Sequence, residues 1–381
     1  EQSTDITLKK LTYITDLVKT PGGGGSYAVN WHIQEQLGKH FELSSPAPIV
    51  PQVSTWERSL SRLQRHILHK PSRFSYFSQA TLESNAKRAE AQIGKNTDAV
   101  FFRSATRWCQ CRPEIPYFVY LDIVFHTFFE NKFEKDDFLA AERERIFQAE
   151  ARFMEGSAMV FFESIWGLDK ANGAYTLAGD QYAVASRGGA LEPPPDDRWT
   201  GNPIALLSVA MNFEQKGGDI IFEAFKQLRK RHPDLRWHIV GGEPSVNWKA
   251  IDGIVYEGVL DPDQQKGLDH YRRLLSQAFV LVHPTREDTN PLVITEAAYF
   301  GCPSISVNRF AIPELIVDGK TGLLLEWPAE PRVLTEAIHR LIESPLEYRQ
   351  MRRAAFEFSR SQFDWNTIGD RMAQSIGAAL A

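Results

Sequence analysis

The sequence predicts an α/β protein with two Rossmann-like, doubly wound domains that face a cleft. Strand-length apolar segments alternate with amphipathic helices in both halves, which is typical of parallel sheets. A Pro-rich polar stretch, 191–202, separates the halves and suits a linker. With 381 residues, the chain has room for two domains. We therefore expect an N-terminal domain over 1–190, a C-terminal domain over 203–360, and a last helix, 361–381, that crosses back to the first domain.

The N-terminal half opens with an apolar strand, a glycine-rich turn at 21–26 and a helix. Alternating apolar segments of strand length recur later, and one long segment is rich in charged residues with helical spacing. The strands are expected at 10–14, 99–103, 118–121 and 159–162, and the helices at 27–39 and 135–155.

The C-terminal half shows the clearer alternation of strands and helices. One helix ends at Gly301, a residue type favoured just after a helix. The strands are expected at 204–209, 235–240, 254–256, 278–282 and 304–307. The helices are expected at 219–231, 271–277 and 291–300, with a further helical stretch at 346–380.

Composition narrows the class of protein. A net charge of -5 gives no general attraction to nucleic acid, and three cysteines are too few for a disulfide framework. No apolar run reaches the roughly 18 residues that a spanning helix needs, and no secretory signal is evident. We expect a cytoplasmic protein without nucleic-acid partners.

The strand at 278–282 runs into a polar elbow that carries the strongest functional signal. Asn290 is expected to cap the next helix, and Pro291 suits its first turn. In open α/β sheets, ligands bind beyond the carboxyl ends of the strands, where helix N-termini attract phosphate. The elbow also carries Glu287 and Asp288, and Glu296 lies further along the helix. A phosphate site and two separated acids suit a nucleotide sugar.

An ordered series of motifs in the second half resembles family 4 of the retaining glycosyltransferases, which have the two-domain GT-B architecture. Asp288 and Glu296 stand eight residues apart, as in the paired acids of that family. The first 190 residues match only loosely, at the glycine loop and around Asp122 and Ser164. The other matching segments are Gln215-Lys216-Gly217-Gly218-Asp219, His232-Pro233, Ile239-Val240-Gly241, Gly301-Cys302-Pro303, Ile312-Pro313-Glu314-Leu315, Asp318-Gly319 and Thr321-Gly322-Leu323-Leu324.

The resemblance implies transfer of a sugar from a nucleotide-diphosphate donor to a hydroxyl acceptor, which is a glycan, a lipid-linked saccharide or a small molecule. In such enzymes the leaving phosphate oxygen accepts the proton of the acceptor on the same face. The protein then positions the reactants and stabilises the departing charge. We expect no cofactor and no metal ion in the chemistry. Two alternatives stay open: a non-catalytic nucleotide-sugar-binding scaffold, and a GT-B epimerase that acts on the nucleotide sugar itself.

Lys216 and the two acids are the first site candidates. A cation at Lys216 can neutralise the diphosphate while the Gly217 backbone comes close. The resemblance gives Glu296 the ribose hydroxyls and Asp288 the transferred sugar, and Glu287 can replace Asp288 if the loop is shifted by one residue. The plainer alternatives are a solvated surface lysine at 216 and a structural ion pair at Glu296.

Further donor contacts are expected around the elbow. Asn290 lies there, and because Pro291 has no N–H, contacts fall to the N–H groups of Leu292 and Val293. The family usually has an arginine where this chain has Met211. Either Arg286 or Arg309 can supply that charge.

The first half offers less specific candidates. Gly23 and Gly24 lie between a strand and a helix, where small residues let a donor approach the backbone, although GGGGS is also a flexible linker. Asp122 and His126 follow the strand at 118–121 and can face the transferred sugar, although a lone histidine is more often structural. Residues 56–70 predict a basic amphipathic helix, with Ser54 as cap, that either contacts an anionic membrane or packs on its sheet.

Overall fold

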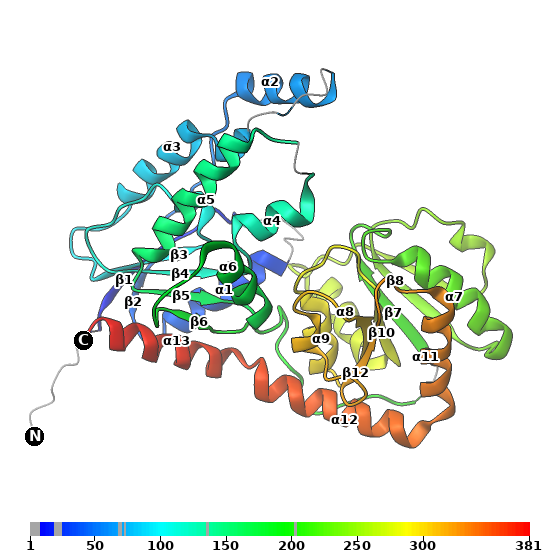
Figure 1. Cartoon of the computed structure of the whole chain (residues 1–381). Coiled ribbons are helices and arrows are strands. Elements are labelled where there is room, and N and C mark those ends of the chain that lie inside the picture. The colour runs from blue at the N-terminus through cyan, green and yellow to red at the C-terminus, as the bar shows by residue number, and fades with distance from the viewer. Residues whose placement is uncertain (1–7, 19–24, 68–70, 72–73, 135–136, 202–203) are drawn as a thin grey trace, which may run out of the picture. The chain divides into compact units, whose positions relative to one another are not determined.

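The computed structural model describes residues 8–18, 25–67, 71, 74–134, 137–201 and 204–381 (Figure 1). The chain forms two compact units. The first comprises Glu1–Lys19, Ser26–Arg187 and Trp365–Ala381, and the second comprises Thr20–Gly25 and Gly188–Asp364. Each unit contains one six-stranded sheet whose neighbouring strands all run parallel. The predicted α/β class is therefore correct for both halves.

The sheet of the first unit has the strand order β2-β1-β3-β4-β5-β6. Its strands are β1 (Lys10–Ile14), β2 (Glu42–Ser44), β3 (Ala99–Arg103), β4 (Tyr117–Leu121), β5 (Met159–Phe162) and β6 (Tyr182–Val184). Its helices are α1 (Gly25–Leu37), α2 (Thr55–His66), α3 (Gln79–Glu90), α4 (Phe125–Lys132), α5 (Ala140–Glu155), α6 (Ile165–Tyr175) and α13 (Trp365–Ala379), with single turns η1 (Ser75–Phe77) and η2 (Thr106–Trp108).

The central strands of this sheet are apolar because helices cover both faces. All five residues of β3 and of β4 are buried, as expected for strands inside a parallel sheet. The short strands β2 and β6 at the two edges were missed by sequence reasoning. Each has only three residues, none of them buried, so neither shows an apolar run.

Two helix starts in the first unit differ from expectation. Helix α5 begins at Ala140 rather than 135, because Phe138 packs into an aromatic cluster where its ring stacks on Phe74 at 4.3 Å between centroids. Helix α2 follows Ser54, but the Ser54 side chain makes no capping bond. Glu57 accepts a hydrogen bond from the Ser78 hydroxyl at 3.3 Å instead, so the predicted capping box is wrong.

The sheet of the second unit has the order β12-β11-β10-β7-β8-β9. Counted within the unit, this is the 3-2-1-4-5-6 order of dinucleotide-binding folds, with the switch point between β7 and β10. Its strands are β7 (Ala205–Ala210), β8 (Arg236–Gly241), β9 (Ile254–Gly258), β10 (Val280–His283), β11 (Ser304–Val307) and β12 (Gly322–Leu325). Its helices are α7 (Gly218–Arg231), α8 (Gln265–Gln277), α9 (Leu292–Tyr299), α10 (Ile312–Leu315), α11 (Pro331–Glu343) and α12 (Pro345–Gln362), with a single turn η3 (Trp248–Ala250).

The chain returns to the first unit after α12, because α13 belongs to that unit. There His40 Nε2 lies 3.0 Å from Asp370 Oδ1, and the His32 ring stacks on Trp365. Among the described residues, no helix combines the length and apolarity that crossing a membrane requires.

Arg352 on α12 ties several segments of the second unit together. Its guanidinium binds Asp197 with two nitrogens at 2.6 and 2.7 Å and donates to the carbonyls of Ala278 and Phe300. The side chain is only 3% exposed and also lies over the Trp199 ring. The predicted linker region is therefore fastened to the last helix of this unit.

We expect Arg352→Met to destabilise the second unit by about 3–5 kcal/mol, because the substitution removes the buried charge that pairs with Asp197 and the donor to the two carbonyls. Denaturant unfolding measures the change. Arg353→Met is the matched control, since that neighbouring arginine is 82% exposed and pairs with Glu357 on the surface. Equal effects of the two substitutions would contradict the assigned role of Arg352.

Candidate active site

The loops that follow β7 and β10 meet at the carboxyl edge of the sheet. These strands are neighbours, with Leu206 opposite Val280. The backbone N–H of Arg286 donates to the Gln215 carbonyl at 2.9 Å, and the Thr285 hydroxyl donates to the same carbonyl at 3.3 Å. The two loops therefore form one surface at the topological switch point, where ligands bind in such sheets.

Lys216 and Asp288 form an ion pair across these loops. Lys216 Nζ lies 2.6 Å from Asp288 Oδ2, and each side chain is about one quarter exposed. Buried His283 Nε2 lies 3.3 Å from the same oxygen. Burial alone would raise the pKa of Asp288, but the hydrogen bond from His283 and the charges of His283 and Lys216 hold that pKa well below its usual range. Asp288 is therefore an ionised acceptor rather than a proton donor at neutral pH.

Thr285 fixes the direction of the acidic loop. It is fully buried, and its hydroxyl oxygen accepts the backbone N–H groups of Asp288 at 3.0 Å and Glu287 at 3.3 Å. This is the side-chain turn that threonine favours two to three residues before the groups it binds. Sequence reasoning missed Thr285, although the Thr-x-x-Asp spacing was a readable signal.

Gly217 is required where the loops touch. Its φ is +77°, in the left-handed region, and a Cβ there would lie 2.3 Å from the Pro284 carbonyl oxygen. Gly217 is also the N-cap residue of α7. The start of α7 therefore lies next to Lys216, where the helix N-terminus favours an anion.

Arg286 is already engaged within the second unit. Its two terminal nitrogens each lie 2.8 Å from a different carboxylate oxygen of Asp219, and it also donates to the Glu214 carbonyl. Burial would raise the pKa of Asp219, but the hydrogen bonds and charge of Arg286 lower it. Arg309, the other candidate, lies over the rings of Phe310 and Trp327. Arg286 therefore holds the two loops to the start of α7.

Glu296 on α9 is 6% exposed and binds two groups that the sequence did not suggest. Its Oε2 accepts the Tyr271 hydroxyl at 2.6 Å, and its Oε1 accepts the Ala190 N–H at 3.2 Å. Burial and the Glu296 charge raise the pKa of Tyr271 well above its ordinary value, so the phenol stays a donor. A carboxylate oxygen has two lone pairs, so each can accept more than one hydrogen bond.

The start of α9 differs from expectation at one residue. Pro291 is the N-cap, with φ -74° and ψ 117°, and no side chain caps the helix. The predicted cap at Asn290 is wrong, because the extended backbone of Pro291 lies between Asn290 and the first turn of the helix. The Asn290 side chain is buried. Leu292 and Val293 are the first helical residues, as required for their N–H groups to face a ligand.

The glycine-rich turn and the first unit hold the remaining candidates. Gly23 and Gly24 lie outside the described residues. Gly25, in the second unit, lies against Leu292, since a Cβ there would be 2.1 Å from the Leu292 side chain. In the first unit, Asp122 follows β4, and His126 on α4 lies 3.5 Å from Glu130 Oε2. The roles of Asp122 and His126 stay predictions.

One Asp-x-Asp sequence, Asp261-Pro262-Asp263, does occur in the chain. Asp261 accepts the N–H of Asp263 at 3.0 Å and the side chain of Gln264 at 3.1 Å. The pair thus forms the turn before α8. Among the described residues it belongs to no group of three potential metal ligands.

Residues 203–344 match the family model described as "Glycosyl transferases group 1". The matched segment lies within the second unit. A glycogen synthase of Mycobacterium tuberculosis is 31% identical over 180 residues, which cover 46% of this chain and 43% of that protein. A GDP-mannose-dependent alpha-(1-6)-phosphatidylinositol monomannoside mannosyltransferase of Mycolicibacterium smegmatis is 28% identical over 203 residues, covering 48% and 52%. The chain spans about half the length of these curated relatives. The resemblance to family 4 is confirmed.

Solved structures confirm the GT-B fold of this chain. Sucrose-phosphate synthase from Thermosynechococcus elongatus has a TM-score of 0.71 at 17% identity, covering 97% of this chain and 98% of that one. WaaG, a glycosyltransferase involved in lipopolysaccharide biosynthesis, has a TM-score of 0.64 at 15% identity, covering 96% and 98%. Anabaena HepE in complex with UDP has a TM-score of 0.65 at 14% identity, covering 97% and 100%.

The lowered pKa of Asp288 predicts a pH dependence of stability. The ionised side chain stabilises the folded unit above its unfolded pKa of about 3.9, and this contribution is lost as pH falls toward the lower folded pKa. We expect the wild type to lose more unfolding free energy than Asp288→Asn between pH 5 and pH 2.5, a window of about one unit either side of the unfolded value. Denaturant unfolding across this range measures it. Asp252→Asn is the control, because that side chain is 95% exposed. Parallel curves for wild type and Asp288→Asn would refute the assignment.

Proposed function

We propose that this chain is a retaining glycosyltransferase that moves a sugar from a nucleotide-diphosphate donor to a hydroxyl acceptor. The ion pair of Lys216 with Asp288 is the observation that carries the proposal. It puts a partly exposed cation and an ionised acid side by side at the switch point of a nucleotide-binding sheet.

Lys216 is the group that meets the diphosphate. Its ammonium is a point charge with three rotatable donors, so it can exchange Asp288 for a phosphate without loss of geometry. The start of α7 adds the positive end of its helix dipole at Gly217. Both stabilise the negative charge that develops on the leaving diphosphate. Arg286 is bound to Asp219, so its role is to hold the loop in place and it does not bind the phosphate.

Asp288 and Glu296 bind the two sugars of the donor. Asp288 stays ionised and accepts hydroxyls of the transferred sugar, with Glu287 beside it. Glu296 uses its remaining lone pairs for the ribose hydroxyls while Tyr271 and Ala190 hold its orientation. The N–H groups of Leu292 and Val293 supply donors at the start of α9. No group in this scheme requires a cofactor or a divalent ion.

Two other functions fit the same donor site. A nucleotide-sugar-binding scaffold would bind the donor without turnover. An epimerase would convert the nucleotide sugar without an acceptor. Donor consumption with and without an acceptor separates both from a transferase.

We expect Lys216→Ala to reduce turnover by about 10²–10³-fold, the cost of losing a group that stabilises developing charge. Transfer is measured in excess EDTA, because the proposal includes no metal ion. Lys226→Ala is the matched control: Lys226 lies further along α7 and pairs with Glu223 at 2.8 Å on the surface. Near-normal turnover of Lys216→Ala would remove this lysine from the reaction.

We expect Glu296→Gln to weaken binding of the free nucleoside diphosphate, while Asp288→Asn mainly lowers transfer. The reason is that one acid is assigned to ribose and the other to the transferred sugar. Calorimetry with the nucleoside diphosphate tests the first assignment. Tyr271→Phe removes the hydroxyl that holds Glu296 but keeps the acid, so it should weaken binding less. Unchanged affinity of Glu296→Gln would show that the ribose lies elsewhere.

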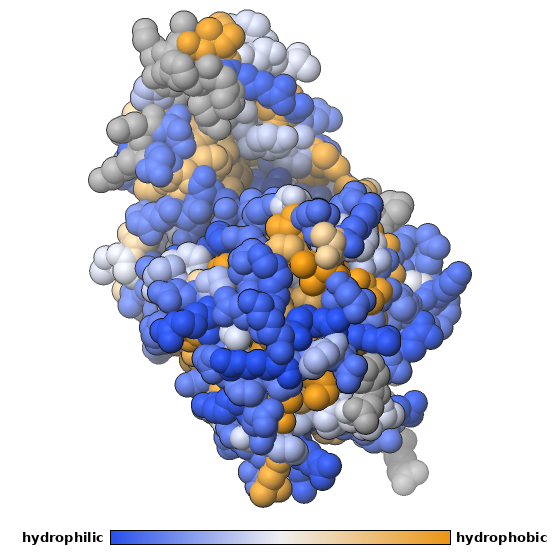
Figure 2. All heavy atoms as spheres, turned by 90° about the vertical axis from the view of Figure 1, so that its right-hand side faces the viewer, coloured by the Kyte–Doolittle hydropathy of each residue, from blue (hydrophilic) through white to orange (hydrophobic). Residues whose placement is uncertain are grey.

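We also propose that α2 contacts an anionic membrane on its cytoplasmic side. Trp56 and Leu63 on this helix and Ile67, the residue directly after it, are exposed at 69%, 42% and 67%. Apolar atoms appear over the same region at the top of Figure 2. Arg58 and Arg62 lie between them on the helix, and a basic amphipathic helix of this kind binds the interface of anionic bilayers.

Removing the apolar side chains should abolish this contact. We expect Trp56→Ser with Ile67→Ser to lower co-sedimentation with vesicles that contain an anionic lipid, because insertion scales with buried apolar area. Leu346→Ser is the control, since Leu346 is 71% exposed at the start of α12. If both variants and the wild type sediment equally with the vesicles, α2 is not the membrane contact.

A further inference from the structure

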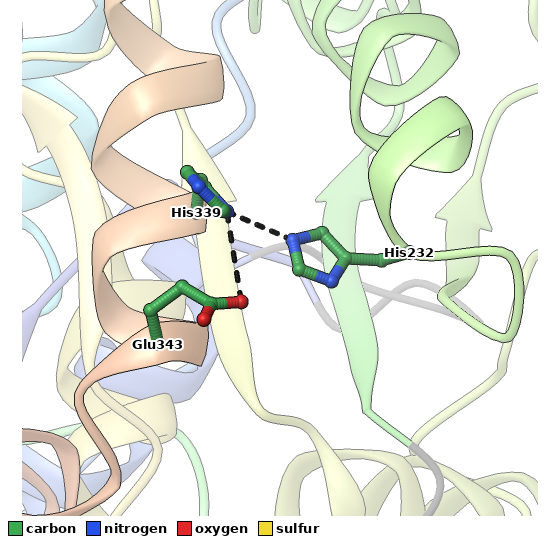
Figure 3. Close-up of side chains that lie close together, drawn as sticks. All are labelled: His232, His339 and Glu343. Carbon is green, nitrogen blue, oxygen red and sulfur yellow. Dashed lines mark hydrogen bonds and ion pairs between the residues drawn. The ribbon is translucent and has the colours of Figure 1, made fainter.

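Two histidines and a glutamate converge on the surface of the second unit, away from the donor site (Figure 3). His232 follows the last residue of α7, and His339 and Glu343 lie one turn apart on α11. His232 Nε2 lies 2.9 Å from His339 Nδ1, and His339 Nδ1 lies 3.9 Å from Glu343 Oε1. One potential ligand atom from each residue lies within 4.8 Å of the others.

The packing of α7 on α11 fixes the backbone of these residues. The Thr335 hydroxyl lies 3.5 Å from the Ala224 carbonyl oxygen, and Arg231 pairs with Glu336 at 3.2 Å. The face of the second unit that carries these helices is mainly hydrophilic in Figure 2. An ion can therefore reach the cluster from solvent while helix packing holds the ligands in place.

The contact between the two imidazoles limits where their protons lie. A nitrogen-to-nitrogen contact of 2.9 Å requires one N–H and one lone pair, so both nitrogens cannot carry protons. The nitrogen that carries the N–H gains a free lone pair for an ion when its proton moves to the other nitrogen of the same ring. Neutral imidazole is the form that ligates metals.

We propose that His232, His339 and Glu343 bind a divalent transition metal of the zinc class. Ligands at about 2.0–2.1 Å in tetrahedral geometry lie about 3.4 Å apart. The observed separations of 2.9 and 3.9 Å lie on either side of that value, so small side-chain rotations suffice. Two nitrogens and one oxygen suit zinc, whereas magnesium and calcium prefer oxygen ligands alone. Water completes the fourth position.

The metal would join the end of α7 to α11 and so stabilise the folded second unit. Helix α7 has 14 residues, so its two ends lie about 21 Å apart at 1.5 Å per residue. Lys216 precedes the start of this helix and His232 follows its end. The metal is therefore remote from the proposed chemistry, and the two proposals fail independently.

Zinc binding to the whole chain tests the site after treatment with EDTA and removal of the chelator. We expect one zinc ion per chain by calorimetry and a higher Tm with zinc but not with magnesium, because a ligand that binds the folded state stabilises it. Cobalt in place of zinc should give the visible absorption bands of a four-coordinate site. His339→Ala should weaken zinc binding by at least about 100-fold, more than the loss of an outer-shell partner costs.

Two further variants make the test decisive. Glu343→Gln removes the carboxylate charge from a side chain that is 61% exposed, so it keeps the fold and should weaken zinc binding by about tenfold or more. His40→Ala is the control, because His40 pairs with Asp370 in the first unit and, among the described residues, belongs to no group of three potential metal ligands. Wild-type zinc affinity in both His339→Ala and Glu343→Gln would overturn the proposal. If only His270→Ala lost zinc binding, the zinc site would be the contact of His270 with Glu257, and the proposal would be wrong.

Discussion

The contact between the loops after β7 and β10 is the constraint on which the site depends. Gly217 lies against Pro284 so closely that no other residue fits, and the Gln215 carbonyl accepts donors from the opposite loop. These main-chain contacts bring Lys216 and Asp288, which are 72 positions apart in the chain, to 2.6 Å. Without this closure, the lysine and the acid would be two unrelated surface charges.

The ion pairs of the second unit differ in how many hydrogen bonds join the two side chains. Arg286 binds Asp219 with both terminal nitrogens, and Arg352 binds Asp197 in the same two-point manner. Planar two-point pairs are specific and costly to break. Lys216 makes a one-point contact with Asp288 and is a quarter exposed. It is therefore better suited than either arginine to exchange its partner for a substrate phosphate.

Helix α7 connects the two functional inferences. Its first turn supports the donor site through Gly217 and Asp219, and its end carries His232. Helix α11 packs against α7, and the Thr335 hydroxyl lies 3.5 Å from the Ala224 carbonyl oxygen. A metal at the far end would stabilise the element that positions the phosphate-binding loop, without contact with the substrate.

The sequence by itself determined the class of fold and most elements. Apolar runs such as those of β3 and β10 are local signals, because a strand buried on both faces is mainly apolar. The spacing of Asp288 and Glu296 and the glycine after Lys216 were equally readable. The three-residue edge strands escaped because they bury too little to show a pattern.

Only the tertiary structure decided which charges meet. The ion pair of Lys216 with Asp288, the engagement of Arg286 by Asp219, and the Tyr271 hydroxyl on Glu296 all join segments far apart in sequence. Helix and strand periodicity report only the near neighbours of a residue. Strand order and the loop contacts that follow from it are set by packing of the whole sheet, so these partners cannot be deduced from spacing.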